Sequence, residues 1–202
     1  MRTLVVHMQT TLNNRIANAD GVFWEPFPWG EEEMIWLNQR FRAADTWALG
    51  RRTYEAIVPW WDQVAAGQVP DDAPGITAAD REFAALLTSM TKVVFSRTLE
   101  STGDRVVVGG DIAAELAALK RRDGKDILLS CGPATLAPLA ATPGLIDEYL
   151  VAIHPAVIAA GPGMFEGLDV DLALELVESR TFEAGAVALR YRVVEVKPRP
   201  SA

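Results

Sequence analysis

The sequence has few of the residues that form disulfides or metal sites. Among 202 residues there is one cysteine, Cys131, and only two histidines, His7 and His154, which are far apart. A single cysteine excludes an intramolecular disulfide and is consistent with a reducing compartment. Because a His/Cys metal cluster cannot be assembled from these residues, we expect no metal site.

Long hydrophobic runs and an excess of positive charge are also absent. The first apolar run covers only residues 4–6, so neither an export signal nor a membrane span of ~18 apolar residues is expected. The formal net charge of −8 gives the chain no general electrostatic reason to bind nucleic acid or an anionic membrane. We therefore expect a cytoplasmic protein that binds neither, and in which a local basic cluster holds any anionic ligand.

The composition that remains is that of an ordinary globular protein. Half of the residues are hydrophobic and 23% are charged, which argues against disorder. A length of 202 residues suits one domain. We predict a single domain over residues 1–202.

Short β-rich segments alternate with helical segments along most of the chain. Strands are predicted at 3–8, 46–49, 92–95, 105–108, 126–130, 148–153, 172–179 and 187–196. Helices are predicted at 31–44, about 51–58, 78–88, 112–122 and 134–140. Residues 59–77 are rich in proline and glycine and predict a long surface loop. Alternating strands and helices are typical of an α/β fold with a mostly parallel sheet.

Turns that follow three predicted strands carry residue types suited to phosphate. In Gly50-Arg51-Arg52-Thr53, a glycine permits close backbone approach, and free helix N–H groups and arginines favour an anion. Ser96-Arg97 suits a phosphate monoester such as the 2′-phosphate of NADPH, and Cys131-Gly132-Pro133-Ala134 again places a glycine between strand and helix. Each turn alone also fits a plain solvated loop, but together they predict one ligand site at one sheet edge.

Cys131 is compatible with two roles, a nucleophile or a small buried residue. No histidine lies near it in the sequence to activate the thiol, so we favour the small buried residue. None of the three turns has the spacing of a Rossmann fingerprint or a P-loop.

The order of these motifs resembles the dihydrofolate-reductase-like family. Residues 50–55 (GRRTYE) look like the G-R-x-T-[YW]-E segment of dihydrofolate reductases. Residues 92–99 (KVVFSRTL) are similar to a segment of bacterial reductases related to the C-terminal domain of the riboflavin-biosynthesis deaminase-reductase. Later segments match in order: Gly110-Asp111, Gly132-x-Ala134-Thr135-Leu136, residues 144–149, His154-Pro155-x-Val157 and Gly161-x-Gly163-x-Phe165. Over about residues 1–195, the resemblance implies a mostly parallel central sheet flanked by helices, with antiparallel C-terminal strands.

The resemblance also implies that NADPH lies across the C-terminal edge of the sheet. The implied cofactor-binding residues are Gly50, Arg51, Arg52 and Thr53 for the phosphates, Ser96 and Arg97 for the 2′-phosphate, and Cys131, Gly132, Ala134 and Thr135 for the pyrophosphate or nicotinamide. The chain departs from the family at Thr11-Leu12-Asn13-Asn14, where relatives usually have Ser-Leu-Asp-Gly, and at Pro133, which has no N–H to offer.

Candidate substrate residues precede and begin the first predicted helix. Glu33, three residues before Trp36, matches the acidic residue that hydrogen-bonds the pterin ring in dihydrofolate reductases. Alternatively, Glu33 and its two neighbouring glutamates merely complement the helix dipole. Tryptophan and phenylalanine side chains are candidates for the wall of a substrate pocket, or else for the core or a dimer interface: Trp24, Phe27, Trp29 and Trp36.

The expected function is NADPH-dependent hydride transfer to a C=N or C=O bond of a small heterocycle, pterin-like or similar to a riboflavin-pathway pyrimidine. The alternative is a non-catalytic or regulatory nucleotide-binding protein on the same fold, whose altered turns reflect lost catalysis. We also expect a homodimer. An exposed β-rich segment such as residues 187–196 needs a partner or a cover, and related reductases are commonly dimeric.

Overall fold

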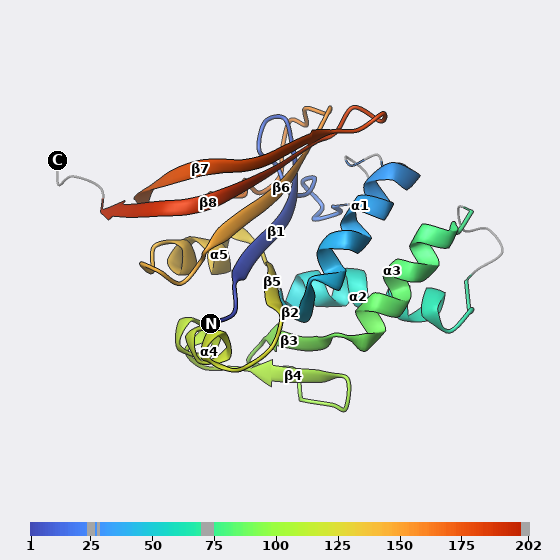
Figure 1. Cartoon of the computed structure of the whole chain (residues 1–202), viewed down its shortest axis with the longest axis horizontal. Helices are drawn as coiled ribbons and strands as arrows, with labels where there is room; N and C mark the ends of the chain where they lie inside the picture. Colours follow the sequence, from blue (N-terminus) through green and yellow to red (C-terminus); the bar gives the residue numbers. More distant parts are fainter. Residues whose placement is uncertain (24–26, 28, 70–74, 199–202) are drawn as a thin grey trace.

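One mixed sheet of eight strands organises the molecule (Figure 1). The computed structural model describes residues 1–23, 27, 29–69 and 75–198. The strand order is β4-β3-β2-β5-β1-β6-β8-β7. Strands β1 to β6 are parallel to one another, β8 is antiparallel to its neighbour β6, and β7 is antiparallel to β8. The strands are β1 (Leu4–Thr11), β2 (Ala44–Gly50), β3 (Thr91–Phe95), β4 (Arg105–Val108), β5 (Asp126–Ser130), β6 (Glu148–His154), β7 (Val170–Thr181) and β8 (Val187–Pro198). This confirms the predicted fold class.

Helices cover both faces of the sheet. One face, which we call the α1 face, carries α1 (Glu31–Arg42), α2 (Arg51–Ala65) and α3 (Ala78–Ser89). The opposite face, the α5 face, carries α4 (Ile112–Arg121) and α5 (Pro133–Ala140). Alternate residues of β1 enter the two cores: Leu4 and Val6 pack on the α5 face and Val5 on the α1 face. The central strands are therefore apolar on both sides, as parallel strands require.

The prediction of a surface loop over residues 59–77 was wrong in its first part, because α2 continues through Pro59 to Ala65. A stripe of apolar residues explains this continuation. Tyr54, Val58 and Trp61 recur at helical spacing and pack in or against the core, and Ile57, Trp61 and Val64 carry the same spacing to the end of the helix. Their burial offsets the backbone hydrogen bond that an internal proline removes. The predicted cap of α4 is confirmed, since Asp111 Oδ1 accepts a hydrogen bond from Ala114 N at 3.0 Å.

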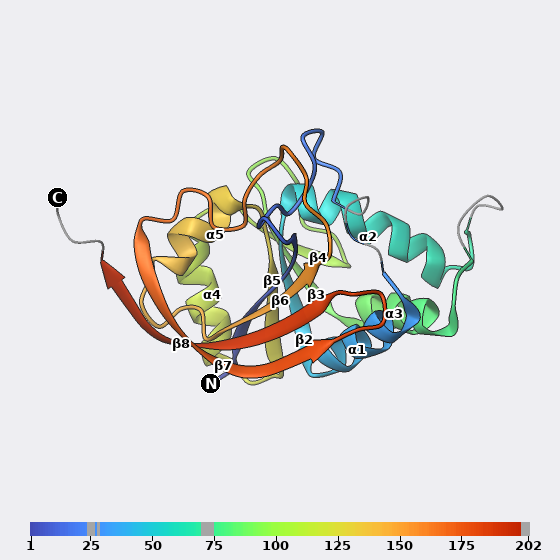
Figure 2. The same ribbon diagram turned by 90° about the horizontal axis from the view of Figure 1, so that it is seen from above.

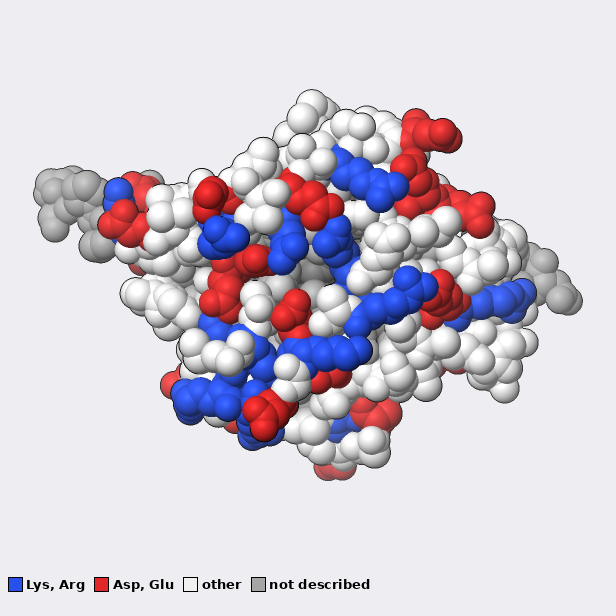
Figure 3. Space-filling model, viewed as in Figure 1, with Lys and Arg blue, Asp and Glu red and all other residues white. Residues whose placement is uncertain are grey.

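The β7–β8 hairpin has two unlike faces and lies along one side of the molecule, with its turn close to α1 (Figure 2). On the α1 face, acidic and basic side chains form ion pairs, among them Arg192–Glu175 at 2.9 Å and Arg40–Glu178 at 2.5 Å. In Figure 3, blue and red side chains alternate across this part of the surface. On the α5 face, Leu174 and Leu176 of β7 lie opposite Val193 and Tyr191 of β8.

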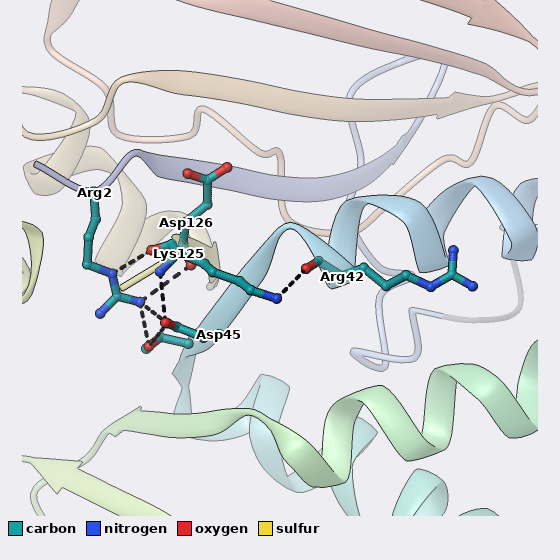
Figure 4. Close-up of polar contacts among 6 residues, drawn as sticks. Arg2, Arg42, Asp45, Lys125 and Asp126 are labelled. Atoms are coloured by element: carbon teal, nitrogen blue, oxygen red, sulfur yellow. Dashed lines mark hydrogen bonds and ion pairs between the residues drawn. The ribbon is translucent and has the colours of Figure 1, made fainter. Parts of the chain in front are cut away.

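The amino ends of β1, β2 and β5 are joined by one polar network (Figure 4). The guanidinium of Arg2 donates to Lys125 O at 2.6 Å and to Thr46 Oγ1 at 2.7 Å, and it forms an ion pair with Asp45. Asp45 also accepts from Lys125 N at 2.8 Å, and Lys125 Nζ donates to Arg42 O at 3.0 Å. The guanidinium of Arg2 is buried, with Arg2 8% exposed, whereas Asp45 is half-buried and Lys125 is exposed, so the network runs from the core to the surface. Among the described residues, no helix is long and apolar enough to cross a membrane.

Candidate cofactor and substrate site

The candidate site lies where β2 and β5 run side by side and the chain leaves them in opposite directions. β2 continues into α2 on the α1 face, whereas β5 continues into α5 on the other face. Such a switch point leaves a crevice outside the carboxyl ends of the strands, which is where open α/β sheets bind ligands. Gly50 is the N-cap of α2 and Gly132 is the N-cap of α5, so both predicted glycine turns border this switch point.

The helix N-termini at this switch point carry no compensating negative charge. Neither α2 nor α5 has a side-chain cap or an acidic residue in its first turn. In contrast, the first turns of α1, α3 and α4 carry acidic residues, and side chains cap α3 and α4. The first N–H groups of a helix have no intrahelical acceptor, so the start of α2 remains available to an anion. At the start of α5 the available donors are fewer, because Pro133 has no N–H and Thr135 N already donates to Gly132 O at 3.1 Å, which leaves the N–H groups of Gly132 and Ala134.

The backbone at the switch point is in contact with its neighbour at Gly50 and is open at Gly132. A Cβ atom added to Gly50 would lie 3.4 Å from Cys131 Cβ, so the two turns are in contact. A Cβ atom added to Gly132 would meet nothing within 4 Å. Gly132 therefore faces free space into which a ligand can approach the backbone. Together with the uncapped helices, this cradle fits the diphosphate of a dinucleotide.

Cys131 lies inside this turn as a buried thiol. It is 2% exposed, and burial raises the pKa of its thiol to about 12. A thiol that stays protonated at neutral pH is a poor nucleophile. The structure therefore agrees with the interpretation of Cys131 as a small space-filling residue.

The predicted basic and hydroxyl residues surround the same edge. Arg51 and Arg52 are exposed at the start of α2, where Arg51 Nη1 lies 3.3 Å from Glu55 Oε1. Thr53 and Thr135 are half-buried in the first turns of α2 and α5, and Ala134 is exposed.

Ser96 and Arg97 follow β3, the strand that pairs with β2. Ser96 Oγ accepts from the N–H groups of Thr98 and Leu99 at 3.1 and 3.0 Å, so it shapes the turn. Arg97 is exposed on that turn.

The two carboxylate oxygens of Glu33 have different surroundings. Its Oε2 accepts a hydrogen bond from Gly30 N at 3.0 Å, which stabilises the start of α1. Its Oε1 is buried and has no hydrogen-bond partner among the described residues, although Glu33 is only 2% exposed. One oxygen therefore stabilises the helix, as the dipole interpretation predicts, and the substrate-binding role of the other stays a prediction.

The predicted aromatic residues divide into two groups. Trp36 is buried in the core, with its ring 5.6 Å from that of Phe182 and beneath the guanidinium of Arg40. Phe27 and Trp29 lie beside the His154 ring, at centroid distances of 4.9 and 5.6 Å. Trp24 lies outside the described residues.

The sequence analysis missed a polar strip on the α1 face of the central strands. His7 is 8% exposed in β1, and Ser130 Oγ donates to the carbonyl oxygen of His7 at 2.9 Å. Ser130 Oγ in turn accepts from Trp47 Nε1 at 3.0 Å. Further along, Gln9 Oε1 and His154 Nε2 are hydrogen-bonded at 3.0 Å. The signal was the presence of histidine and glutamine inside an otherwise apolar central strand.

The departure from the family pattern after β1 has a structural explanation. Asn14 has a φ of 61°, which asparagine tolerates better than most residues, in place of the glycine usual in relatives. Asn13 bridges two loops, because its amide donates to Ile158 O at 2.8 Å and its carbonyl accepts from Ile158 N at 3.3 Å. An aspartate could not donate to Ile158 O.

Solved structures with the same architecture have the dihydrofolate-reductase-like fold. A putative riboflavin biosynthesis protein from Shewanella sp. PV-4 superposes with a TM-score of 0.67 at 19% identity, covering 96% of this chain and 99% of that one. The dihydrofolate reductase of Enterococcus faecalis, complexed with NADP(H), superposes with a TM-score of 0.59 at 14% identity, covering 96% and 97%.

A family model described as the RibD C-terminal domain matches residues 2–188. The chain therefore belongs to the RibD C-terminal domain family. Among proteins similar in sequence is the uncharacterized protein YyaP of Bacillus subtilis, which is 29% identical over 192 residues and 94% covered in both chains. A Thermotoga maritima protein named as a deaminase and 5-amino-6-(5-phosphoribosylamino)uracil reductase superposes with a TM-score of 0.65 at 14% identity, covering 95% of this chain and 56% of that one.

Proposed function

We propose that the protein is an NADPH-dependent reductase that transfers a hydride to a C=N or C=O bond of a small heterocycle, either pterin-like or similar to a riboflavin-pathway pyrimidine. The observation that carries this proposal is the pairing of two uncapped helix N-termini at the contact between Gly50 and Cys131. Membership of the RibD C-terminal domain family supports the reductase class, as do neighbours named as a uracil reductase and as an NADP(H) complex.

Each part of the edge has a role in this function. Bound NADPH supplies the hydride. The first turns of α2 and α5 hold its phosphates through backbone N–H groups, while Arg97 and the Ser96 turn hold the 2′-phosphate. Glu33 Oε1 accepts a hydrogen bond from a ring N–H of the substrate and thereby orients it. Phe27 and Trp29 restrict water on the substrate side.

Cofactor binding and turnover test this proposal separately. Calorimetric titration should give a micromolar or lower dissociation constant for NADPH, and absorbance at the nicotinamide band should fall when dihydrofolate or the phosphoribosylaminopyrimidine is added. Absence of NADPH binding would contradict the proposal. Tight NADPH binding without oxidation by either substrate would instead favour the alternative, a non-catalytic nucleotide-binding protein.

We also propose that the protein is a homodimer formed through the apolar α5 face of the β7–β8 hairpin. Leu174, Leu176 and Val194 on the hairpin are 37%, 53% and 64% exposed, which is unusual for large apolar side chains on two adjacent strands. A groove of about 220 Å³ between this face and residues 164–165 has Leu174 and Tyr191 in its wall. A two-fold arrangement would cover both copies of this face.

Sedimentation velocity at micromolar concentration should give twice the 22.0 kDa of one chain. Leu176→Glu should convert this species to a monomer, whereas Glu175→Gln, on the charged face of the same strand, should leave it intact. A wild-type protein that sediments only as a monomer would contradict the dimer.

A further inference from the structure

The α5 face of the sheet carries a groove beside the β7–β8 hairpin. Alternate residues of three neighbouring strands form its floor, among them Thr10 of β1, Val151 and Ile153 of β6 and Leu189 of β8, and residues 164–165 form a wall. Among the described residues, none from α4 or α5 lines the groove. Val151 and Ile153 are only half-buried, although β6 is the sixth of eight strands and a strand in this position normally has both faces covered. The groove is therefore a part of the sheet face that the two helices leave uncovered.

Two hydroxyl groups belong to residues that line this groove and have no hydrogen-bond partner among the described residues. Thr10 is 3% exposed, and no described group bonds to its hydroxyl. Tyr149 is 1% exposed, and its hydroxyl is likewise buried without a described partner. Burial raises the pKa of Tyr149, so this hydroxyl is neutral at physiological pH. Because native proteins rarely leave buried hydroxyls unpaired, the floor suits a ligand with a polar group better than a purely apolar one.

The size and charge of the groove narrow the class of ligand further. Its lining contains no charged side chain among the described residues, so a charged molecule would lose hydration there without gaining an opposite charge. Met164, Phe165 and Leu174 offer apolar surface to a ring. The volume is about 220 Å³, whereas an apolar cavity of about 150 Å³ is large enough to hold benzene. A neutral bicyclic ring of about ten non-hydrogen atoms fits this space.

We propose that the groove is a second binding site, which takes a neutral bicyclic aromatic molecule with one hydroxyl or N–H group and bonds that group to the Thr10 hydroxyl. The site lies across the sheet from the proposed substrate residues, because Trp29 and Glu33 belong to the α1 face. None of the described residues that line it belongs to the cofactor turns at Gly50 and Gly132. The proposed site therefore goes beyond the reductase function and does not depend on it.

Three naphthalene derivatives test the ligand class on the wild-type protein. 1-Naphthol should bind with a dissociation constant on the order of 100 μM, measured by the fluorescence of its ring. Naphthalene lacks the hydroxyl and should bind about tenfold more weakly, the effect of one lost hydrogen bond. 1-Naphthoate carries a carboxylate and should show no saturable binding. 1-Naphthol should also shift the methyl resonances of Val151, Ile153 and Leu189. Absent 1-naphthol binding, equal binding of all three probes, or unshifted methyl resonances would contradict the site.

Two substitutions separate the hydrogen bond from the space. Thr10→Val removes an unpaired hydroxyl, so it should unfold at the same or a higher temperature, bind 1-naphthol about tenfold more weakly and bind naphthalene as before. Val151→Phe should abolish binding of both probes, because the larger ring fills the floor of the groove. Val106→Phe adds the same ring on the edge strand β4 and is the matched control, which should bind both normally. Wild-type affinity for 1-naphthol in Thr10→Val or in Val151→Phe would overturn the proposal.

A second copy of the chain is the competing occupant, because the proposed dimer uses the same face. Leu174 belongs to both surfaces, whereas Leu176 and Val194 are outside the lining of the groove. We expect 1-naphthol to bind the wild-type protein and Leu176→Glu with the same affinity, as titrations of both measure. Binding by Leu176→Glu alone would show that a second copy fills the groove, and the small-molecule site would then be wrong.

Discussion

The two edges of the parallel sheet differ in whether their polar groups have hydrogen-bond partners within the protein. At the amino edge, Arg2, Asp45 and Lys125 satisfy one another and the ends of three strands. At the carboxyl edge, α2 and α5 begin without caps, and Gly132 faces open space. Polar groups that bond to one another at the amino edge stabilise the folded chain. Backbone N–H groups without an acceptor at the carboxyl edge can instead form hydrogen bonds with a ligand. The comparison predicts that substitutions at the two edges separate stability from binding.

The largest effect is expected at the amino edge. Arg2→Leu should lower the free energy of unfolding by about 3 kcal/mol, because it removes a buried guanidinium, breaks the ion pair with Asp45 and leaves the carbonyl groups of Lys125 and Asp126 without this donor. NADPH affinity should not change. Urea denaturation measures the first quantity and calorimetry the second. As a control, Arg192→Leu breaks an exposed ion pair with Glu175 and should cost less than about 1 kcal/mol. Equal losses for the two variants would contradict the structural role of Arg2.

Next in size is the effect of a side chain at Gly132. Gly132→Val should weaken NADPH binding roughly a hundredfold, about 2.7 kcal/mol, by filling the space that the ligand needs. Stability should hardly change, since φ at Gly132 is −70° and its Cβ would meet no neighbour. Gly103→Val, in an equally open position before β4, is the matched control and should bind NADPH normally. Unaltered NADPH binding by Gly132→Val would contradict the placement of the cofactor at this turn.

His7, between the two edges, should make the protein sensitive to acid. Its pKa is about 4 when folded and near 6.5 when unfolded, so protonation favours the unfolded chain as the pH falls below about 6.5. This loss should reach about 2 kcal/mol at pH 5, relative to pH 8, and level off below about pH 4. Denaturation of His7→Phe across this range should lack that component. Parallel pH profiles for variant and wild type would contradict the burial of a neutral imidazole.

The smallest effect concerns Arg97. Because Arg97 is exposed, its contact with a 2′-phosphate should contribute near the low end for a charged hydrogen bond, about tenfold in affinity. Arg97→Ala should therefore weaken NADPH about tenfold and leave NADH unchanged, as measured by titration with each cofactor. Arg121→Ala, at the end of α4, should affect neither. An equal loss of affinity for NADPH and NADH would contradict the assignment of Arg97 to the 2′-phosphate.

Much of the fold could be predicted from the sequence because local patterns determine it. Alternating β-rich and helical segments predict the elements, and Asp111 is recognisable as a cap. The extent of α2 was missed because Pro59 suggests a loop, while the buried stripe that carries the helix to Ala65 depends on packing against α3 and the sheet. The position of β5 between β1 and β2 is likewise a tertiary property, since its partners are distant in the sequence.

The site was predictable only in part. Glycine, arginine and serine at three turns indicate phosphate, but the contact between Gly50 and Cys131 exists only because β2 and β5 pair. Glu33 could be proposed as a site residue from its position in the sequence. Only the structure shows that one of its oxygens bonds to Gly30 N while the other has no described partner. His7 was noted only as too isolated to hold a metal, since nothing local shows that its ring lacks a partner in the core.

Hydrogen–deuterium exchange with and without NADPH tests the difference between the two edges most directly. The account predicts that NADPH slows exchange of the backbone amides of residues 51–53 and 96–98 and of Gly132 and Ala134, at the starts of α2 and α5 and after β3. Amides at the amino edge, including those of Asp45 and Lys125, should exchange at the same rate in both samples. Protection confined to the amino edge, or no protection at the starts of α2 and α5 under saturating NADPH, would contradict the assignment of the carboxyl edge as the cofactor site.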